Sequence, residues 1–168
     1  MTRLLVSYLS LRAPPSAVPE KGRGDLTIRR EMLNVESYLS LYRSVGEPWR
    51  WDQRLKMDRA TLSRHLDSSD CDIIIARHAD NTTLGFCEFD STRLPDIQLV
   101  NFGLIPHLQG RGLGLILLRE ALYTVWQTRL PQRIWLHTDE WDHPGALKVY
   151  RRAGFVVDRQ SYEEAADL

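Results

Sequence analysis

Apolar runs and alternating apolar and polar positions divide the chain into short extended segments, typical of strands in a partly buried sheet. Seven segments have this pattern: 4–12, 25–30, 72–77, 84–90, 97–105, 134–137 and 155–157. Polar residues in the stretch ADNTT, between the third and fourth of these, predict a hairpin connection. The pattern predicts one sheet of six or seven strands.

Helical periodicity appears between these segments. Asn34 is an expected cap for a helix that ends near Gly46, and Asp58 caps a second over 58–66. Two more are expected over 113–126 and 144–153, the last with Pro144 at its start and Gly154 just past its end. Strands and helices alternate without an internal repeat, which predicts an α/β (α+β-like) fold with about four helices around the sheet.

Length and composition indicate one domain over residues 1–168, because 43% hydrophobic residues in 168 suffice for one core. Segment 1–24 is expected to be an N-terminal strand followed by a connector over 13–24 with three prolines and two glycines. Ser7 and Ser10 interrupt the N-terminal apolar run, which lacks a small-residue cleavage site. We therefore interpret the run as a strand of a cytoplasmic protein.

The balanced charge gives no sign of a nucleic-acid or membrane partner. Lys and Arg number 22 and Asp and Glu number 22, so no long-range field attracts nucleic acid or an anionic membrane. Cys71 and Cys87 lack metal-ligand spacing, and no histidine pair has a helical metal motif, so no metal is expected. The partner is expected to be small or recognised locally.

Three glycines follow the apolar segment before Pro106: Gly110, Gly112 and Gly114. A helix N-terminus with nearby glycines exposes backbone N–H groups to an anion, which predicts a phosphate or pyrophosphate site. A dinucleotide-binding loop would need glycine where Leu115 stands, and a P-loop would need a lysine that this loop lacks. Neither of these two motifs fits.

The spacing that does fit, Gln109-x-x-Gly112-x-Gly114, resembles the acetyl-CoA signature of the GNAT superfamily of N-acetyltransferases. A second run is similar to that superfamily's last helix, with Ala146, Tyr150, Gly154 and Phe155 at the expected positions. His143 replaces the usual asparagine, and the sequence Asp-His-Pro before the helix resembles a subgroup. The resemblance implies the GNAT fold, with acetyl-CoA held between the strands predicted at 97–105 and 134–137.

The resemblance also implies roles for individual residues. Tyr150 matches the tyrosine that protonates the departing thiolate, and the backbone around Gly103 matches a bulge that meets the thioester carbonyl. The residues implied in binding acetyl-CoA are Phe102, Gly103, Leu104, Gln109, Gly110, Arg111, Gly112, Leu113, Gly114 and His143.

The general base and the acceptor pocket are less defined. Many relatives carry a glutamate on the fourth strand, where the nearest polar residue here is Gln98, so Glu88 on the adjacent strand is the first candidate and His137 and Asp139 are the next. The run EPWRWDQRLK suggests an acceptor wall. In it, Trp49 and Trp51 would supply aromatic surfaces, and Arg54, or alternatively Arg50, would meet a substrate carboxylate. The alternative is that these tryptophans cap the core.

These observations predict an acetyl-CoA-dependent N-acetyltransferase that acts on a primary amine of a small or amino-acid-like molecule by direct transfer. Two alternatives stay open: acetylation of a protein N-terminus or lysine, and a non-catalytic acyl-CoA sensor. Balanced charge disfavours a nucleic-acid target. A monomer and a homodimer are equally compatible with the sequence.

Overall fold

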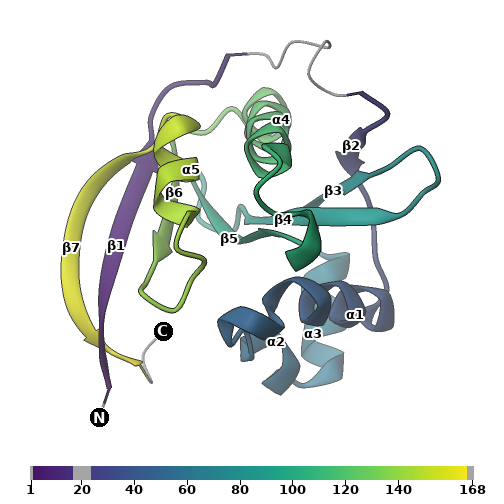
Figure 1. Ribbon diagram of the computed structural model, residues 1–168, viewed down its shortest axis with the longest axis horizontal. Coiled ribbons are helices and arrows are strands. Elements are labelled where there is room, and N and C mark those ends of the chain that lie inside the picture. Colours follow the sequence, from purple (N-terminus) through teal and green to yellow (C-terminus); the bar gives the residue numbers. More distant parts are fainter. Residues whose placement is uncertain (1, 17–23, 166–168) are drawn as a thin grey trace.

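A seven-stranded mixed sheet runs through the part of the chain that the computed structural model describes, residues 2–16 and 24–165 (Figure 1). The strand order is β2-β3-β4-β5-β6-β1-β7, and only the pair β5 and β6 is parallel. The bounds are β1 Arg3–Leu11, β2 Thr27–Arg30, β3 Cys71–Arg77, β4 Thr83–Asp90, β5 Asp96–Leu104, β6 Arg133–Thr138 and β7 Val156–Glu164. The predicted strands and the α/β class are confirmed.

Helices cover both faces of this sheet. In Figure 1, α1, α2 and α3 lie on one face and α4 and α5 on the other. The bounds are α1 Val35–Gly46, α2 Gln53–Lys56, α3 Arg59–Asp67, α4 Leu113–Arg129 and α5 Ala146–Arg152, with 3₁₀ turns at Glu47–Trp49 and Pro106–Leu108. The four expected helices are present, and the short α2 is an addition. No described helix has the length and apolarity needed to cross a bilayer.

The two predicted caps form as expected. The Asn34 side chain accepts a hydrogen bond from the Ser37 N–H at 2.9 Å, and the Asp58 carboxylate accepts one from the Thr61 N–H at 3.0 Å. Each satisfies one of the N–H groups that a helix leaves unpaired in its first turn. These caps set the starts of α1 and α3, the helices on the side of the sheet that carries Glu88.

The N-terminal strand lies far in space from the strand that follows it. β1 pairs with β6 and β7, with Leu11 opposite Ile134 and Leu5 opposite Tyr162, whereas β2 is the opposite edge of the sheet. Residues 17–23, within the expected connector, lie outside the described residues. β7 extends well past the predicted 155–157, because pairing with β1 keeps the polar sequence after Val157 extended.

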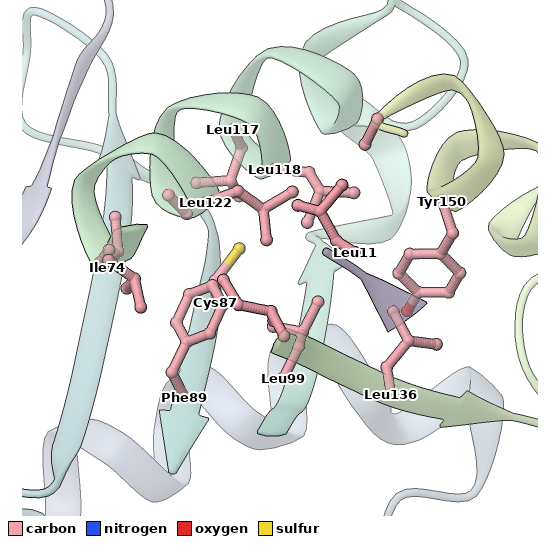
Figure 2. Close-up of a cluster of buried hydrophobic side chains, with 14 of the residues drawn as sticks. Leu11, Ile74, Cys87, Phe89, Leu99, Leu117, Leu118, Leu122, Leu136 and Tyr150 are labelled. Atoms are coloured by element: carbon pink, nitrogen blue, oxygen red, sulfur yellow. The ribbon is translucent and has the colours of Figure 1, made fainter. Parts of the chain in front are cut away.

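Two hydrophobic clusters hold the layers together. The larger joins α4 and α5 to the sheet, and Figure 2 shows Leu117, Leu118 and Leu122 of α4 within it. Tyr150 of α5 lies at the edge of this cluster beside Leu136 of β6 (Figure 2). The smaller cluster joins α1 and α3 to the other face.

The sheet divides between its parallel strands. β5 and β6 pair only over Asp96–Gln98 with Arg133–Trp135, and beyond these residues no pairing continues. The expected bulge does lie on β5, but at Val100, where Asn101 is opposite Glu88 and Leu99 opposite Phe89, rather than over Phe102–Leu104. Gly103 has a different reason: a Cβ there would overlap Cγ1 of Val45 in α1. The division opens the space for the candidate site.

Candidate functional site

Two cavities lie at this division. The first, here called the glycine-loop cavity, has a volume of about 450 Å³ and is bounded by β5, the loop before α4, and α5. Of the residues predicted to bind acetyl-CoA, those lining it are Phe102, Gly103, Leu104, Gln109, Gly110, Gly112, Gly114 and His143. Arg111 and Leu113 do not line it: Arg111 is exposed on the loop, and Leu113 packs on the core. The sequence motif is thus gathered around one hollow.

The second, here called the aromatic cavity, has a volume of about 680 Å³ and shares part of its lining with the first. Its aromatic lining comes from Tyr42, Trp49, Trp51, Phe102, Trp141 and Tyr150, and its polar lining includes Asp52, Asn101, His137, Asp139 and Asp142. Five residues line both cavities: Trp49, Trp51, Phe102, Asp142 and Tyr150. The two cavities are therefore adjacent, and these five residues are here called the shared wall.

The loop before α4 has the backbone that an anion site requires. Gly110 and Gly112 have φ of +80° and +77°, which residues other than glycine rarely adopt. Gly112 is the N-cap residue of the 17-residue helix α4, and no side chain caps its first turn. The free N–H groups and the positive end of the helix dipole are left available beside the cavity. Lys148 and Arg152 of α5 line the same cavity and add positive charge.

His143 holds the turn that precedes α5. Its Nδ1 accepts a hydrogen bond from the Gly145 N–H at 2.8 Å, and its ring meets the Trp49 ring edge-on at 5.0 Å. This contact connects the α5 side of the glycine-loop cavity to the segment after α1. His143 is therefore both a wall of the cavity and part of its framework.

Tyr150 is one of the five residues of the shared wall. The residue is 7% exposed, and its ring packs edge-on against Phe102 and Phe155. Burial, with a smaller contribution from the charge of Asp142, raises the pKa of the Tyr150 phenol well above its usual value. The hydroxyl is therefore protonated at neutral pH and available as a donor.

Glu88 has a different environment from the one expected for a general base. It is fully buried and lines neither cavity. Its Oε1 accepts from Arg54 at 2.5 Å and lies 2.8 Å from His65 Nε2, and its Oε2 accepts from Tyr38 and, at 2.9 Å, from Asn101. Burial alone would raise the pKa of Glu88, but these hydrogen bonds and the Arg54 charge lower it to about 2. Such a carboxylate is a fixed anion and a poor proton acceptor at neutral pH.

His65, Cys71 and Glu88 are close enough for one metal ion to contact all three. However, the Arg54 guanidinium already lies 3.2 Å from His65 Nε2 and donates a hydrogen bond to Glu88, so two of the three groups already contact a cation. Burial also raises the pKa of the Cys71 thiol to about 12, so the thiolate form that binds metals is disfavoured. We interpret this group as an internal ion-pair cluster.

The predicted acceptor residues separate into two sets. Trp49 and Trp51 line both cavities as aromatic surfaces, and Trp51 also packs against Tyr42 and Phe86. Arg54 lines neither cavity, because its guanidinium is used by Glu88. Arg50 does line the aromatic cavity, with its guanidinium 4.9 Å from the centre of the Trp141 ring.

The secondary candidates for the base, His137 and Asp139, both line the aromatic cavity. Burial raises the pKa of Asp139, and the charge of Asp142 acts in the same direction, although the Trp141 N–H, which donates to Asp139 at 2.7 Å, opposes them. His137 Nδ1 is buried and has no hydrogen-bond partner among the described residues. An aspartate with a raised pKa in a cavity is a better proton acceptor than Glu88.

Sequence reasoning did not select Asn101, Trp141 or Asp142 as site residues. The signal for Asn101 was its position as the polar residue within the otherwise apolar run LVNFGL at the end of β5. Trp141 and Asp142 immediately precede His143, which was selected. All three line the aromatic cavity, and Asp142 lines both cavities.

A mixed sheet that divides between two parallel strands, with a glycine-rich helix start at the division, is the architecture of the N-acetyltransferases. Residues 38–155 match the model of the acetyltransferase (GNAT) family, and the chain therefore belongs to that family. No curated protein matches the chain significantly.

Solved structures show the same fold. A GCN5-related N-acetyltransferase from Sphaerobacter thermophilus has a TM-score of 0.66 and 24% identity, over 95% of this chain and 50% of its own. An acetyltransferase of the GNAT family from Novosphingobium aromaticivorans has a TM-score of 0.64 and 16% identity, and the match covers 96% of this chain and 63% of that one. A spermidine N-acetyltransferase from Vibrio cholerae has a TM-score of 0.60 and 18% identity, and the match covers 79% of this chain and 80% of that one. The chain thus spans half to under two thirds of the length of the first two.

Proposed function

We propose that the protein transfers an acetyl group from acetyl-CoA to the primary amine of a small molecule, directly and without an acetylated enzyme intermediate. The observation that carries this proposal is that two cavities share a wall containing Tyr150. A two-substrate transfer needs the reacting atoms of both substrates at one point. We further propose that residues 1–168 act as one acetyltransferase domain, of the subgroup with Asp-His-Pro before the last helix.

In this proposal acetyl-CoA occupies the glycine-loop cavity. Its pyrophosphate would lie on the N–H groups between Gln109 and Gly114, where positive φ at Gly110 and Gly112 leaves the backbone accessible. Its thioester would lie beside Phe102–Leu104, near the shared wall. Arg111 would contact the phosphates only from the exposed side of the loop.

The acceptor amine occupies the aromatic cavity and attacks the thioester carbonyl. A bond forms between the amine nitrogen and the carbonyl carbon, and the carbon–sulfur bond breaks. Only a neutral amine can attack, so an amine that arrives protonated first loses one proton to solvent. Asp139 takes the proton that the nitrogen loses after attack, and His137 is the second candidate for this role. The Tyr150 hydroxyl donates to the sulfur as negative charge develops there.

The lining of the aromatic cavity favours a cationic amine with an apolar or aromatic body. Asp139 and Asp142 attract a protonated amine, whereas Lys56 is already paired with Asp52. Arg50 could also receive a carboxylate, which keeps amino-acid-like acceptors within the proposal. The fold shared with a spermidine N-acetyltransferase is consistent with a small amine.

Thiol release from acetyl-CoA with a panel of small primary amines, free amino acids and short peptides tests this function. We expect thiol release with at least one small amine. We also expect the pH profile of kcat to have an acid limb, in which activity falls as the pH is lowered. Asp139 must be ionised to act as the base. Its pKa is raised, so activity should be lost as the pH falls through a value above the ordinary one of 3.8. Asp139→Asn is expected to lower kcat by about 10²-fold or more and to abolish this limb.

Two controls distinguish the titration of Asp139 from the titration of the substrate amine. The limb due to Asp139 should stay in place when amines of different pKa are compared, whereas a limb due to the amine would move. Asp142→Asn should shift the limb to lower pH, because it removes a charge that raises the pKa of Asp139. An Asp139→Asn variant with the wild-type profile would contradict the assignment, and release with peptides alone would favour a protein substrate.

A further inference from the structure

Asn101 connects the buried ion-pair cluster to the aromatic cavity. It is opposite Glu88 in the ladder between β4 and β5, next to the bulge at Val100, and it lines the cavity. Its Nδ2 donates to Glu88 Oε2 at 2.9 Å. An ionised carboxylate accepts hydrogen bonds and donates none, so the amide must turn its NH₂ group towards Glu88.

This orientation leaves the other half of the amide available. No hydrogen bond to Asn101 Oδ1 is found among residues 2–16 and 24–165, and this oxygen is not among their buried unpaired atoms. Because the amide group is planar, Oδ1 lies on the branch away from Nδ2. The polar atom of Asn101 that remains for a ligand in the aromatic cavity is therefore an acceptor.

Glu88 is held in place by enough contacts to fix the orientation of the Asn101 amide. Tyr38 from α1, Arg54 from α2 and His65 from α3 all contact its carboxylate. The side chain of Glu88 is 0% exposed and that of Arg54 13%, so water does not compete for these bonds. The three helices on this face thus orient one amide on β5 through a single carboxylate.

We propose that Asn101 Oδ1 accepts a hydrogen bond from the N–H of the acceptor amine, and that Glu88 is a positioning residue that keeps this oxygen facing the aromatic cavity. The inference rests on the proposed function. A neutral primary amine has a lone pair and two N–H bonds. The lone pair attacks the thioester, one proton passes to the base after attack, and the other N–H donates to Asn101. The site should therefore favour primary amines over their N-methyl analogues, which have a single N–H.

Asn101→Leu tests the first half of the proposal. In the thiol-release assay, we expect kcat/KM for a primary amine to fall about tenfold, with the KM for acetyl-CoA unchanged and kcat/KM for the N-methyl analogue little affected. The preference for the primary amine should thus largely disappear. Asn101→Ala is measured in parallel and has the same expected outcome. It also removes the oxygen, and its smaller side chain cannot obstruct the cavity.

Glu88→Gln and Tyr38→Phe test the second half. The amide that Glu88→Gln introduces can donate to Asn101 Oδ1, which lets the asparagine turn its NH₂ group into the cavity, so the preference for primary amines should fall as in Asn101→Leu. Tyr38→Phe is the matched control, because it removes another hydrogen bond to the same carboxylate oxygen and leaves Asn101 in place. It should keep the preference. In ¹⁵N–¹H spectra, the Asn101 side-chain NH₂ resonances should shift in Glu88→Gln and stay in place in Tyr38→Phe.

The outcomes separate this inference from the proposed function. A wild-type protein that releases no thiol with any amine would overturn the proposed function and the inference with it. An active protein whose Asn101 variants keep the wild-type preference would overturn the inference alone. So would a Tyr38→Phe variant that loses the preference to the same extent, because the effect would then follow from weakening the cluster in general.

Discussion

Replacing Tyr150 by Phe is expected to lower kcat for acetyl transfer by about 10²-fold, while the affinity for acetyl-CoA changes little. The ring is retained, so the packing against Phe102 and Phe155 is unchanged. The lost hydroxyl makes no hydrogen bond to any described residue, so the melting temperature should also be preserved. What is lost is the donor that meets the developing thiolate at the shared wall. Steady-state kinetics and acetyl-CoA calorimetry on the purified variant measure the two quantities.

Tyr162→Phe is the control for removal of a tyrosine hydroxyl, because Tyr162 is 60% exposed on β7 and lines neither cavity. It should have wild-type kinetics. If Tyr150→Phe has the same kcat as this control, Tyr150 is a wall residue without a role in proton transfer.

Replacing Arg54 by Met is expected to reduce the free energy of unfolding by about 3–5 kcal/mol at neutral pH. Met retains most of the apolar stem but removes the guanidinium, so the carboxylate of Glu88 is left buried without its cation. Urea denaturation of both proteins measures the difference. Lys56→Met is the matched control from the same helix, because Lys56 is 75% exposed and pairs with Asp52 at the surface, and it should change stability little.

The loss in Arg54→Met should also depend on pH. In the wild-type protein the pKa of Glu88 is depressed to about 2, so its ion pair stabilises the fold fully above the ordinary value of 4.5 and is lost as the pH falls towards 2. Without Arg54, burial raises the pKa of Glu88 above its wild-type value. As the pH falls, Glu88 is therefore protonated at a higher pH in the variant than in the wild-type protein. The difference between the two proteins should therefore shrink in acid. A difference that is independent of pH, or no larger than that of Lys56→Met, would contradict this account.

The glycine loop and Tyr150 could be located from the sequence because each belongs to a contiguous motif whose spacing survives folding. Gln109, Gly112 and Gly114 lie within six residues, and the helix that carries Tyr150 is marked by Pro144 and Gly154. Alternation of apolar residues likewise gave the strands, since a buried face imposes it locally.

Features that depend on pairing between distant residues were not predictable in this way. Arg54 was assigned to a substrate because Glu88, 34 residues away, is visible as its partner only in the folded protein. The orientation of Asn101 depends on the ladder between β4 and β5 and on the bulge at Val100. The place of β1 between β6 and β7 is a property of strand order, which no local pattern encodes.

Calorimetric titration of the protein with acetyl-CoA tests the central claim most directly, with Gly112→Ala and Gly114→Ala as a matched pair. We expect saturable one-site binding by the wild-type protein. Gly112→Ala should bind about tenfold more weakly, because an L-residue at φ +77° costs about 1–2 kcal/mol unless the loop changes shape. Gly114→Ala should bind normally, because its Cβ would make ordinary contacts of 3.6 Å with Leu104 and Phe102. Absence of binding by the wild-type protein, or equal binding by both variants, would contradict the assignment of this loop to acetyl-CoA.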